Sequence, residues 1–412
     1  MAWIDSPEHH ERLAAETERL FAFAERSALP SGGFGYLDER GEPDAERPVE
    51  LWITCRMTHV FALAALQGRP GAAELVDHGL AALTGSFADA EHGGWFGSLD
   101  PVTGAPISTV KDAYPHAFVI LAASSAAVAG RPGAPELLAS ALAISTEHFW
   151  DEAAGMSVES WDRAFATLEE YRGVNANMHT VEAYLAAWGV TRDRTWLDRA
   201  LRIIERVLGY ARENSWRLPE HFDPHWRPLL DYNKDAPAHP FRPYGATIGH
   251  WFEWSRLTLH ARAELLALGE AAPAWLLDDA AGLFDAGVRE GWDVDGAPGF
   301  VYTVDWDGTP VVRERMHWVL CEALGAAAAL HTATGDPRFD AAYRGWWDYA
   351  ERFFVDRVSG SWWHELSPVN EVSRTVWEGK ADVYHAVQAT FVPRLPLAPA
   401  FAPAIAAGLL AS

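Results

Sequence analysis

The chain has 412 residues, 49% of them apolar, and carries a formal net charge of −24 at pH 7. The excess of acidic groups argues against nucleic acid and anionic membranes as partners, and no apolar run reaches the roughly 18 residues that a membrane-spanning helix needs. The charged N-terminus lacks a signal-peptide core, and Cys55 and Cys321 have no metal-binding spacing, so we expect a reduced, cytoplasmic setting.

Short glycine and aromatic segments with strand-like alternation recur along the chain. Turn residues follow each of them, which predicts a small hairpin at every occurrence. The segments are 33–38, 94–100, 155–161, 299–305 and 360–365, with a weaker copy at 218–222. Such a recurrence is the signature of a repeated structural unit.

Each hairpin is followed by a helix that is apolar on nearly every side, as in residues 117–129 and 319–330, and such helices are buried. These helices end in tight connectors such as Gly-Arg-Pro-Gly at 130–133, a pattern that stops one helix and starts the next. The second helix of each unit is amphipathic; the one at 197–208 has leucine and isoleucine on one face and charged residues on the other.

About six such units predict an all-α fold, an (α/α)6 barrel with six buried helices inside an outer ring. Because the hairpins always precede the buried helix, they should gather at one end, around one pocket. We expect the segments 7–26 and 398–410 to close the ring, and a single catalytic domain to span 1–412. A superhelical α-solenoid is the alternative architecture.

The predicted buried helices begin with polar side chains where core residues would be expected. In the segment 241–257, Pro243 and Gly245 break regular structure, after which His250, Glu253 and Trp254 share one helical face. The polar positions recur in phase with the repeat: Trp52, Arg56 and His59; Lys111, Asp112, Tyr114 and His116; Asn175, Asn177, His179 and Glu182; His250, Glu253 and Trp254; Arg315, His317, Trp318 and Glu322; Lys380, Asp382, Tyr384 and His385. Such a recurrence is hard to explain by packing, so we expect these residues to line the pocket.

Histidines dominate this set, and no pair of carboxylates stands out. An imidazole both accepts and donates protons near neutral pH, and Arg56 is a fixed cation that can hold a developing oxyanion. The i, i+3 pairs His250/Glu253 and His179/Glu182 leave shared metal ligation open, but the established zinc signatures are absent. The sequence therefore predicts proton transfer with no metal and no cofactor.

The order of these residues along the chain resembles the N-acylglucosamine 2-epimerase superfamily, a group of (α/α)6-barrel sugar isomerases and epimerases. The resemblance covers nearly the whole chain, and 241–257 looks most like the mannose isomerase and sulfoquinovose isomerase branch. It is carried by Trp52, Arg56, Tyr114, Asn175-x-x-x-His179, Gly249-His250-x-x-Glu253-Trp254, Trp318-x-x-x-Glu322 and His385.

The resemblance implies an aldose–ketose isomerase that interconverts D-mannose, or a similar aldose such as D-lyxose, with D-fructose or the matching ketose. It implies His250 and His385 as the acid/base pair, with His179 and Arg56 assisting catalysis. The sugar would be bound by Asn175, His179, Glu253, Glu322 and Arg56 in a subsite lined by Trp52, Tyr114 and Trp318. The expected partner is a monosaccharide, and the expected assembly is a monomer or small homo-oligomer.

Several alternatives remain open from the sequence. A sugar 2-epimerase of the N-acylglucosamine or cellobiose type needs the same residues, and a sulfoquinovose isomerase needs a cation such as Arg242 near C6 of the sugar. An inverting glycosidase on the same barrel would need two carboxylates across the pocket, for which Glu253, Glu322, Glu365 and Asp382 are candidates. A non-catalytic sugar-binding protein would keep the tryptophans and have little need for the histidines.

Overall fold

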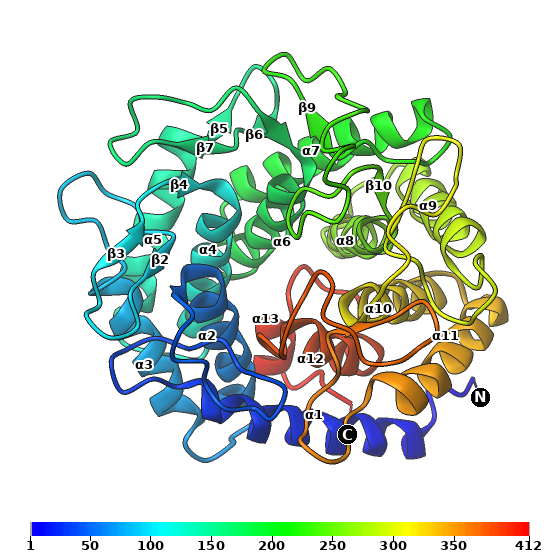
Figure 1. The fold of residues 1–412 in the computed structure, drawn as a ribbon, viewed down its shortest axis with the longest axis horizontal. Coiled ribbons are helices and arrows are strands. Elements are labelled where there is room, and N and C mark those ends of the chain that lie inside the picture. The colour runs from blue at the N-terminus through cyan, green and yellow to red at the C-terminus, as the bar shows by residue number, and fades with distance from the viewer. Residues whose placement is uncertain (1, 412) are drawn as a thin grey trace.

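The computed structural model describes residues 2–411, whose helices form two concentric rings (Figure 1). The inner ring consists of α2 (Leu51–Leu66), α4 (Ala113–Val128), α6 (Val174–Thr191), α8 (Ile248–Ala267), α10 (His317–Thr334) and α12 (Tyr384–Phe391). The outer ring consists of α1 (Pro7–Ala24), α3 (Ala72–Thr84), α5 (Ala134–Ile144), α7 (Arg194–Glu213), α9 (Trp275–Gly291) and α11 (Pro337–Tyr349). The predicted (α/α)6 barrel is confirmed.

Burial explains the two rings. Nearly every residue of α4 is buried, because this helix packs on both inner neighbours, α2 and α6, as well as on α5. By contrast, α7 buries the apolar stripe that includes Leu197 and Ile204 and exposes arginine and glutamate on its other side. Within the described chain, no helix is both long and apolar enough to cross a bilayer.

The strands are short, and most of them connect one unit to the next. A two-residue strand directly precedes each of the first five inner helices and pairs antiparallel with the hairpin of the following unit. These pairs are β1 (Val49–Glu50) with β2 (Ser98–Leu99), β4 (Lys111–Asp112) with β7 (Ser160–Trp161), β8 (Arg172–Gly173) with β9 (His221–Phe222), β10 (Ala246–Thr247) with β11 (Thr303–Val304), and β12 (Arg315–Met316) with β13 (Glu365–Leu366). The remaining strands, β3 (Pro106–Ser108), β5 (Trp150–Asp151) and β6 (Met156–Ser157), add to β2 or to each other.

One residue in each of these hairpins anchors the start of an inner helix. Its carbonyl accepts a hydrogen bond from the first N–H of the helix in the preceding unit, at 2.8–3.2 Å. We call these the hairpin anchor residues: Gly97 for α2, Glu159 for α4, Glu220 for α6, Tyr302 for α8 and His364 for α10. The backbone of each anchor residue is thereby held against the start of an inner helix.

The C-terminal segment does not close the ring as expected. The ring is closed by α1, which packs on α12 and α2, whereas α13 (Phe401–Ala406) packs on α2, α4 and α6. Figure 1 shows α13 within the ring. His260, near the C-terminal end of α8, donates a hydrogen bond to the Ala398 carbonyl at 2.5 Å. The tail therefore plugs the end of the barrel that lies away from the hairpins.

Candidate active site

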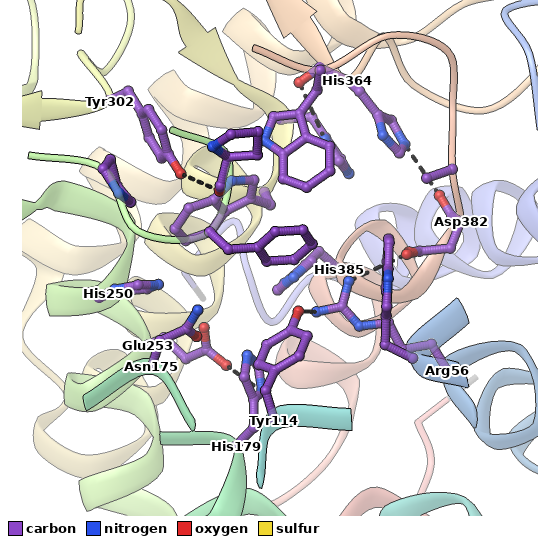
Figure 2. Close-up of a pocket in the computed structure, with 18 residues that line it drawn as sticks. Arg56, Tyr114, Asn175, His179, His250, Glu253, Tyr302, His364, Asp382 and His385 are labelled. Carbon is purple, nitrogen blue, oxygen red and sulfur yellow. Dashed lines mark hydrogen bonds and ion pairs between the residues drawn. The ribbon is translucent and has the colours of Figure 1, made fainter. Parts of the chain in front are cut away.

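A cavity of about 710 Å³, measured to its open mouth, lies at the hairpin end of the barrel. Every site residue expected from the sequence except Glu322 lines the cavity: Trp52, Arg56, Tyr114, Asn175, His179, His250, Glu253, Trp318 and His385. In Figure 2, Arg56 and His250 lie on opposite sides of it. The repeat has thus brought the early turns of all six inner helices to one place.

His385 is held by a carboxylate. Its Nδ1 lies 2.9 Å from Glu322 Oε1, and the other oxygen of Glu322 accepts a bond from Arg256 Nε, also at 2.9 Å. Because Glu322 accepts from Nδ1–H, the Nε2 lone pair of His385 is left for the cavity. Burial, together with the positive charge of Arg56, holds the pKa of His385 well below its ordinary value. His385 is therefore neutral and available as a base.

Glu322 is not among the residues that line the cavity, so its direct contact with a sugar stays a prediction. Only 1% of its surface is exposed, and both of its carboxylate oxygens are used by His385 and Arg256. It lies four residues after Trp318, which lines the cavity, and so one helical turn further along the same face of α10. Its geometry is that of a group that orients a histidine.

His250 is held in the same way by a different element. Its Nδ1 lies 3.0 Å from Oε2 of Glu220, the hairpin anchor residue beside β9. The ring centroid of Trp318 lies 5.2 Å from that of His250 and 5.8 Å from that of His385. Two carboxylate-bound imidazoles therefore flank one indole in the cavity wall.

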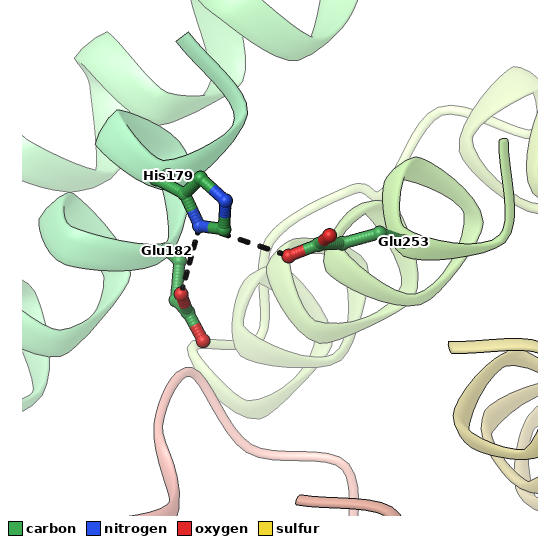
Figure 3. A group of neighbouring side chains, drawn as sticks. All are labelled: His179, Glu182 and Glu253. Carbon is green, nitrogen blue, oxygen red and sulfur yellow. Dashed lines mark hydrogen bonds and ion pairs between the residues drawn. The ribbon is translucent and has the colours of Figure 1, made fainter. Parts of the chain in front are cut away.

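His179 lies near two carboxylates, and the three side chains form the most metal-like cluster of the described residues (Figure 3). Its Nδ1 is 3.5 Å from Glu182 Oε2 and 3.8 Å from Glu253 Oε1. Glu182 also accepts bonds from the Tyr384 hydroxyl and from Gln388 Nε2, and Arg256 Nη2 lies 3.6 Å from Glu253. A cation would have to face this guanidinium, so the donor set fits orientation of His179 better than metal ligation.

Glu253 is the least satisfied acid in the site. It is 1% exposed, and neither of its oxygens has a hydrogen-bond partner among the described residues. Burial and the neighbouring negative charge of Glu322 raise its pKa well above the ordinary value. A buried carboxyl group without partners is costly, so its position in the cavity wall suits it to bind a polar ligand.

Arg56 is fixed by two polar contacts and several rings. Its Nη1 lies 3.2 Å from Asp382 Oδ2, and its Nη2 donates to the Tyr114 hydroxyl at 2.9 Å. The guanidinium carbon is within 5.0 Å of the ring centroids of Trp52, Phe118 and Tyr384. The Tyr114 hydroxyl accepts from Arg56 and so keeps its own proton for a ligand. Asp382 is therefore a partner of Arg56, not a free acid.

Arg242, the candidate for binding a charged group on C6, is engaged elsewhere. Both of its terminal nitrogens donate to Glu169, at 2.9 and 3.0 Å, and its guanidinium stacks 3.9 Å from the ring centroid of Tyr171. It does not line the cavity, whereas its neighbour Phe241 does. The ring of Phe241 lies 5.2 Å from Trp377 and 6.2 Å from Trp52, between centroids, which narrows the mouth with aromatic side chains.

Some polar residues of the inner helices have structural partners instead. Lys111 pairs with Asp89 at 3.1 Å, Lys380 with Asp356 at 2.6 Å, and Arg315 with a hairpin carboxylate, Asp295, at 2.5 Å. These buried ion pairs hold hairpins against helix starts, outside the cavity. The in-phase polar pattern therefore contains two classes of residue, and the expectation that all of them line the pocket was wrong.

The cavity wall also contains residues that the sequence analysis did not assign to the site. Tyr302 and His364 line it, and both are hairpin anchor residues, as is Glu220 behind His250. The recurring glycine and aromatic segments already marked these positions, since each anchor residue lies within or beside such a segment. His317, whose ring stacks on His364 with 3.9 Å between centroids, completes this side of the wall.

Comparison with known proteins identifies the family to which the chain belongs. Residues 32–389 match the family model of N-acylglucosamine 2-epimerase (GlcNAc 2-epimerase). The chain is 54% identical to a D-mannose isomerase from Thermobifida fusca, covering 98% of both chains, and 50% identical to one from Pseudomonas cannabina pv. alisalensis, covering 98% of this chain and 97% of the other. A crystal structure of a D-mannose isomerase superposes with a TM-score of 0.86 at 28% identity, covering 95% of this chain and 98% of that one. The chain belongs to the N-acylglucosamine 2-epimerase family.

Proposed function

We propose that the protein is an aldose–ketose isomerase that interconverts D-mannose and D-fructose. The observation that carries the proposal is the pair of carboxylate-bound imidazoles, His250 and His385, on either side of Trp318 in one cavity. Full-length identities of 54% and 50% to D-mannose isomerases support the same substrate. The chemistry needs only proton transfers, which the residues of the cavity can perform.

In the proposed reaction, Nε2 of His385 takes the proton from C2 of the open-chain aldose. The electrons of the C2–H bond form the C1–C2 double bond of a cis-enediol, and the carbonyl oxygen O1 becomes an oxyanion that takes up the proton released by the hydroxyl on C2. His385 returns its proton to C1, while the hydroxyl on C2 loses its proton and becomes the ketone. The cation of Arg56 stabilises the oxyanion, an effect of the oxyanion-hole kind.

Mannose is mostly cyclic, so the ring must open before C2 can react. We assign this step to His250, whose Nε2 takes the proton of the hydroxyl on C1 and delivers it to the ring oxygen as the C1–O5 bond breaks. Glu253, Asn175 and His179 are placed to bind sugar hydroxyls, and Trp52 and Trp318 offer flat faces for the sugar's C–H surface. A positioned acid/base of this kind contributes about 10²–10⁴-fold.

The alternatives fit less well. Among the described residues that line the cavity, Arg56 is the one lysine or arginine, and we assign it to the oxyanion, so a sulfonate on C6 would lack a counter-charge of its own. Glu365 uses its carboxylate on the backbone amides of 375–377, Asp382 is paired with Arg56, and Glu322 binds His385 and Arg256. Glu253 is therefore left without a second free carboxylate to complete the pair that an inverting glycosidase needs. A 2-epimerase remains the second candidate, since His250 could reprotonate C2 from the opposite face.

The proposal is tested by following unlabelled mannose, fructose, glucose and lyxose in D2O by NMR. We expect mannose and fructose to interconvert and deuterium to enter at C1 and C2. Conversion of mannose to glucose as the main product would favour a 2-epimerase, and the absence of any exchange would contradict both readings.

We place the reaction in the cytoplasm, in keeping with two buried cysteines that form no disulfide.

A further inference from the structure

The two carboxylate-bound histidines differ in their surroundings. Glu322, behind His385, is neutralised by Arg256, whose Nε lies 2.9 Å from it. Glu220, behind His250, pairs with no lysine or arginine among the described residues, and its Oε1 has no hydrogen-bond partner. The carboxylate behind His385 is thus balanced by a cation, whereas the carboxylate behind His250 faces the imidazole without one.

The position of Glu220 is fixed by the backbone on both sides. Its carbonyl accepts a bond from Val174 N at 3.2 Å, and β9 begins at the next residue, which pairs with Gly173. Nε2 of His221 in turn lies 2.7 Å from the carbonyl oxygen of Pro243. The Glu220 side chain is 3% exposed, so its contact with His250 is held by the hairpin and is shielded from water.

The other ionisable groups around His250 contribute little charge near pH 7. They are His221 in β9, His179 on α6, Glu253 on α8 and, across Trp318, His385 on α12. Burial lowers the pKa of His221, lowers that of His179 to about 4, and with the charge of Arg56 lowers that of His385. Burial and Glu322 raise the pKa of Glu253. Glu220 is thus the nearest net charge that His250 meets.

We propose that Glu220 is the positioning residue that equips His250 for ring opening. Its carboxylate fixes Nδ1 as the protonated nitrogen of His250 and stabilises the imidazolium that forms when Nε2 takes the proton of the anomeric hydroxyl. The imidazolium then gives that proton to the ring oxygen as the C1–O5 bond breaks, and the imidazole is regenerated. This inference rests on the proposed isomerase function but concerns ring opening alone.

Ring opening can be measured without isomerisation, as the rate at which the α and β anomers of mannose interconvert. His385→Asn removes the base for C2 and leaves the His250 side of the cavity intact. We expect the His385→Asn variant to interconvert the anomers faster than buffer alone does. In the double variant, which also carries Glu220→Gln, this acceleration should be at least tenfold smaller. In the otherwise wild-type enzyme, Glu220→Gln should lower kcat on mannose with little change in KM. Because His250 must be unprotonated to take the anomeric proton, loss of the carboxylate should move the acid limb of the kcat profile to lower pH.

Glu159→Gln is the matched control, because Glu159 is the buried anchor residue of the preceding unit and contacts no cavity histidine. It should leave both rates unchanged, and equal melting temperatures will show that the variants fold. If Glu220→Gln, which keeps an acceptor for Nδ1–H, retains wild-type anomer interconversion, the proposal is wrong. If interconversion depends on Glu220 but no ketose forms in the wild type, the proposed function is wrong and the role of Glu220 stands.

Discussion

At the scale of single residues, the charge around each imidazole decides its task. The same side chain, bound through Nδ1 in both cases, meets a neutralised carboxylate at His385 and an unneutralised one at His250. A base that removes a proton from carbon must be unprotonated at rest, and a group that opens a ring must accept and return a proton within one step. The two environments suit these two requirements.

We therefore expect His385→Asn and His250→Asn to differ in kind. His385→Asn should abolish deuterium exchange into every substrate, because we assign removal of the C2 proton to His385 alone. His250→Asn should slow the conversion of mannose by about 10²–10⁴-fold, yet keep measurable exchange into fructose, which has the larger open-chain fraction. Exchange measured by NMR in D2O distinguishes them, and equal, complete loss in both would show that both act on carbon.

At the scale of elements, the loop between β9 and β10 forms one wall of the cavity. It contributes Pro240, Phe241 and Pro243, and it is tied down by the paired contact of Arg242 with Glu169. Bidentate arginine–carboxylate contacts fix geometry as well as adding energy. The loop is long and irregular, so this contact holds the aromatic mouth of the site in place.

Arg242→Ala should accordingly raise KM for mannose by roughly three- to tenfold while lowering kcat less, because positioning of the wall suffers and the histidines are untouched. Steady-state kinetics at saturating and limiting mannose separate the two effects. Arg227→Ala is the control, since Arg227 lies in the same loop, is exposed and has no side-chain hydrogen bond. An unchanged KM in Arg242→Ala would mean that the loop keeps its place without this anchor.

The elements differ in how far the sequence predicts them. The helices followed from apolar periodicity and the cavity residues from polar positions that recur on inner helices, because both patterns are local. The pairing of β8 with β9, and with it the contact of Glu220 with His250, joins different units through two-residue strands that have no periodicity of their own. The place of α13 likewise depends on which end of the barrel is left open, a property of the assembled ring.

At the scale of the whole molecule, buried neutral histidines make stability depend on pH. Burial lowers the pKa of His59 and His260 to about 4 and that of His116 to about 3, against 6.5 in an unfolded chain. As pH falls below 6.5, these histidines bind protons in the unfolded state but not in the folded state. Each such histidine then lowers the free energy of unfolding by about 1.4 kcal/mol per pH unit until its folded pKa is reached.

We expect the free energy of unfolding to fall between pH 6.5 and 5, measured by chemical denaturation at several pH values. Glu50 and Glu159 act in the opposite direction, because burial raises the pKa of each to about 7, but histidines with lowered pKa outnumber them. His116→Gln, which can keep the bonds to the Trp95 amide and the Asp112 carbonyl, should flatten the dependence. A stability that rises on acidification would contradict this account.

The contact between Arg56 and Asp382 has a consequence for the order of events as the protein forms. The two residues are 326 positions apart in the chain, and the ring closes between them where α12 meets α2. Contacts between successive units are more local and face a smaller entropic barrier, so they form earlier. The guanidinium to which we assign stabilisation of the oxyanion thus gains its partner only with the final closure. During refolding, enzyme activity would recover more slowly than helix content, and the time course of activity would report the last step of assembly.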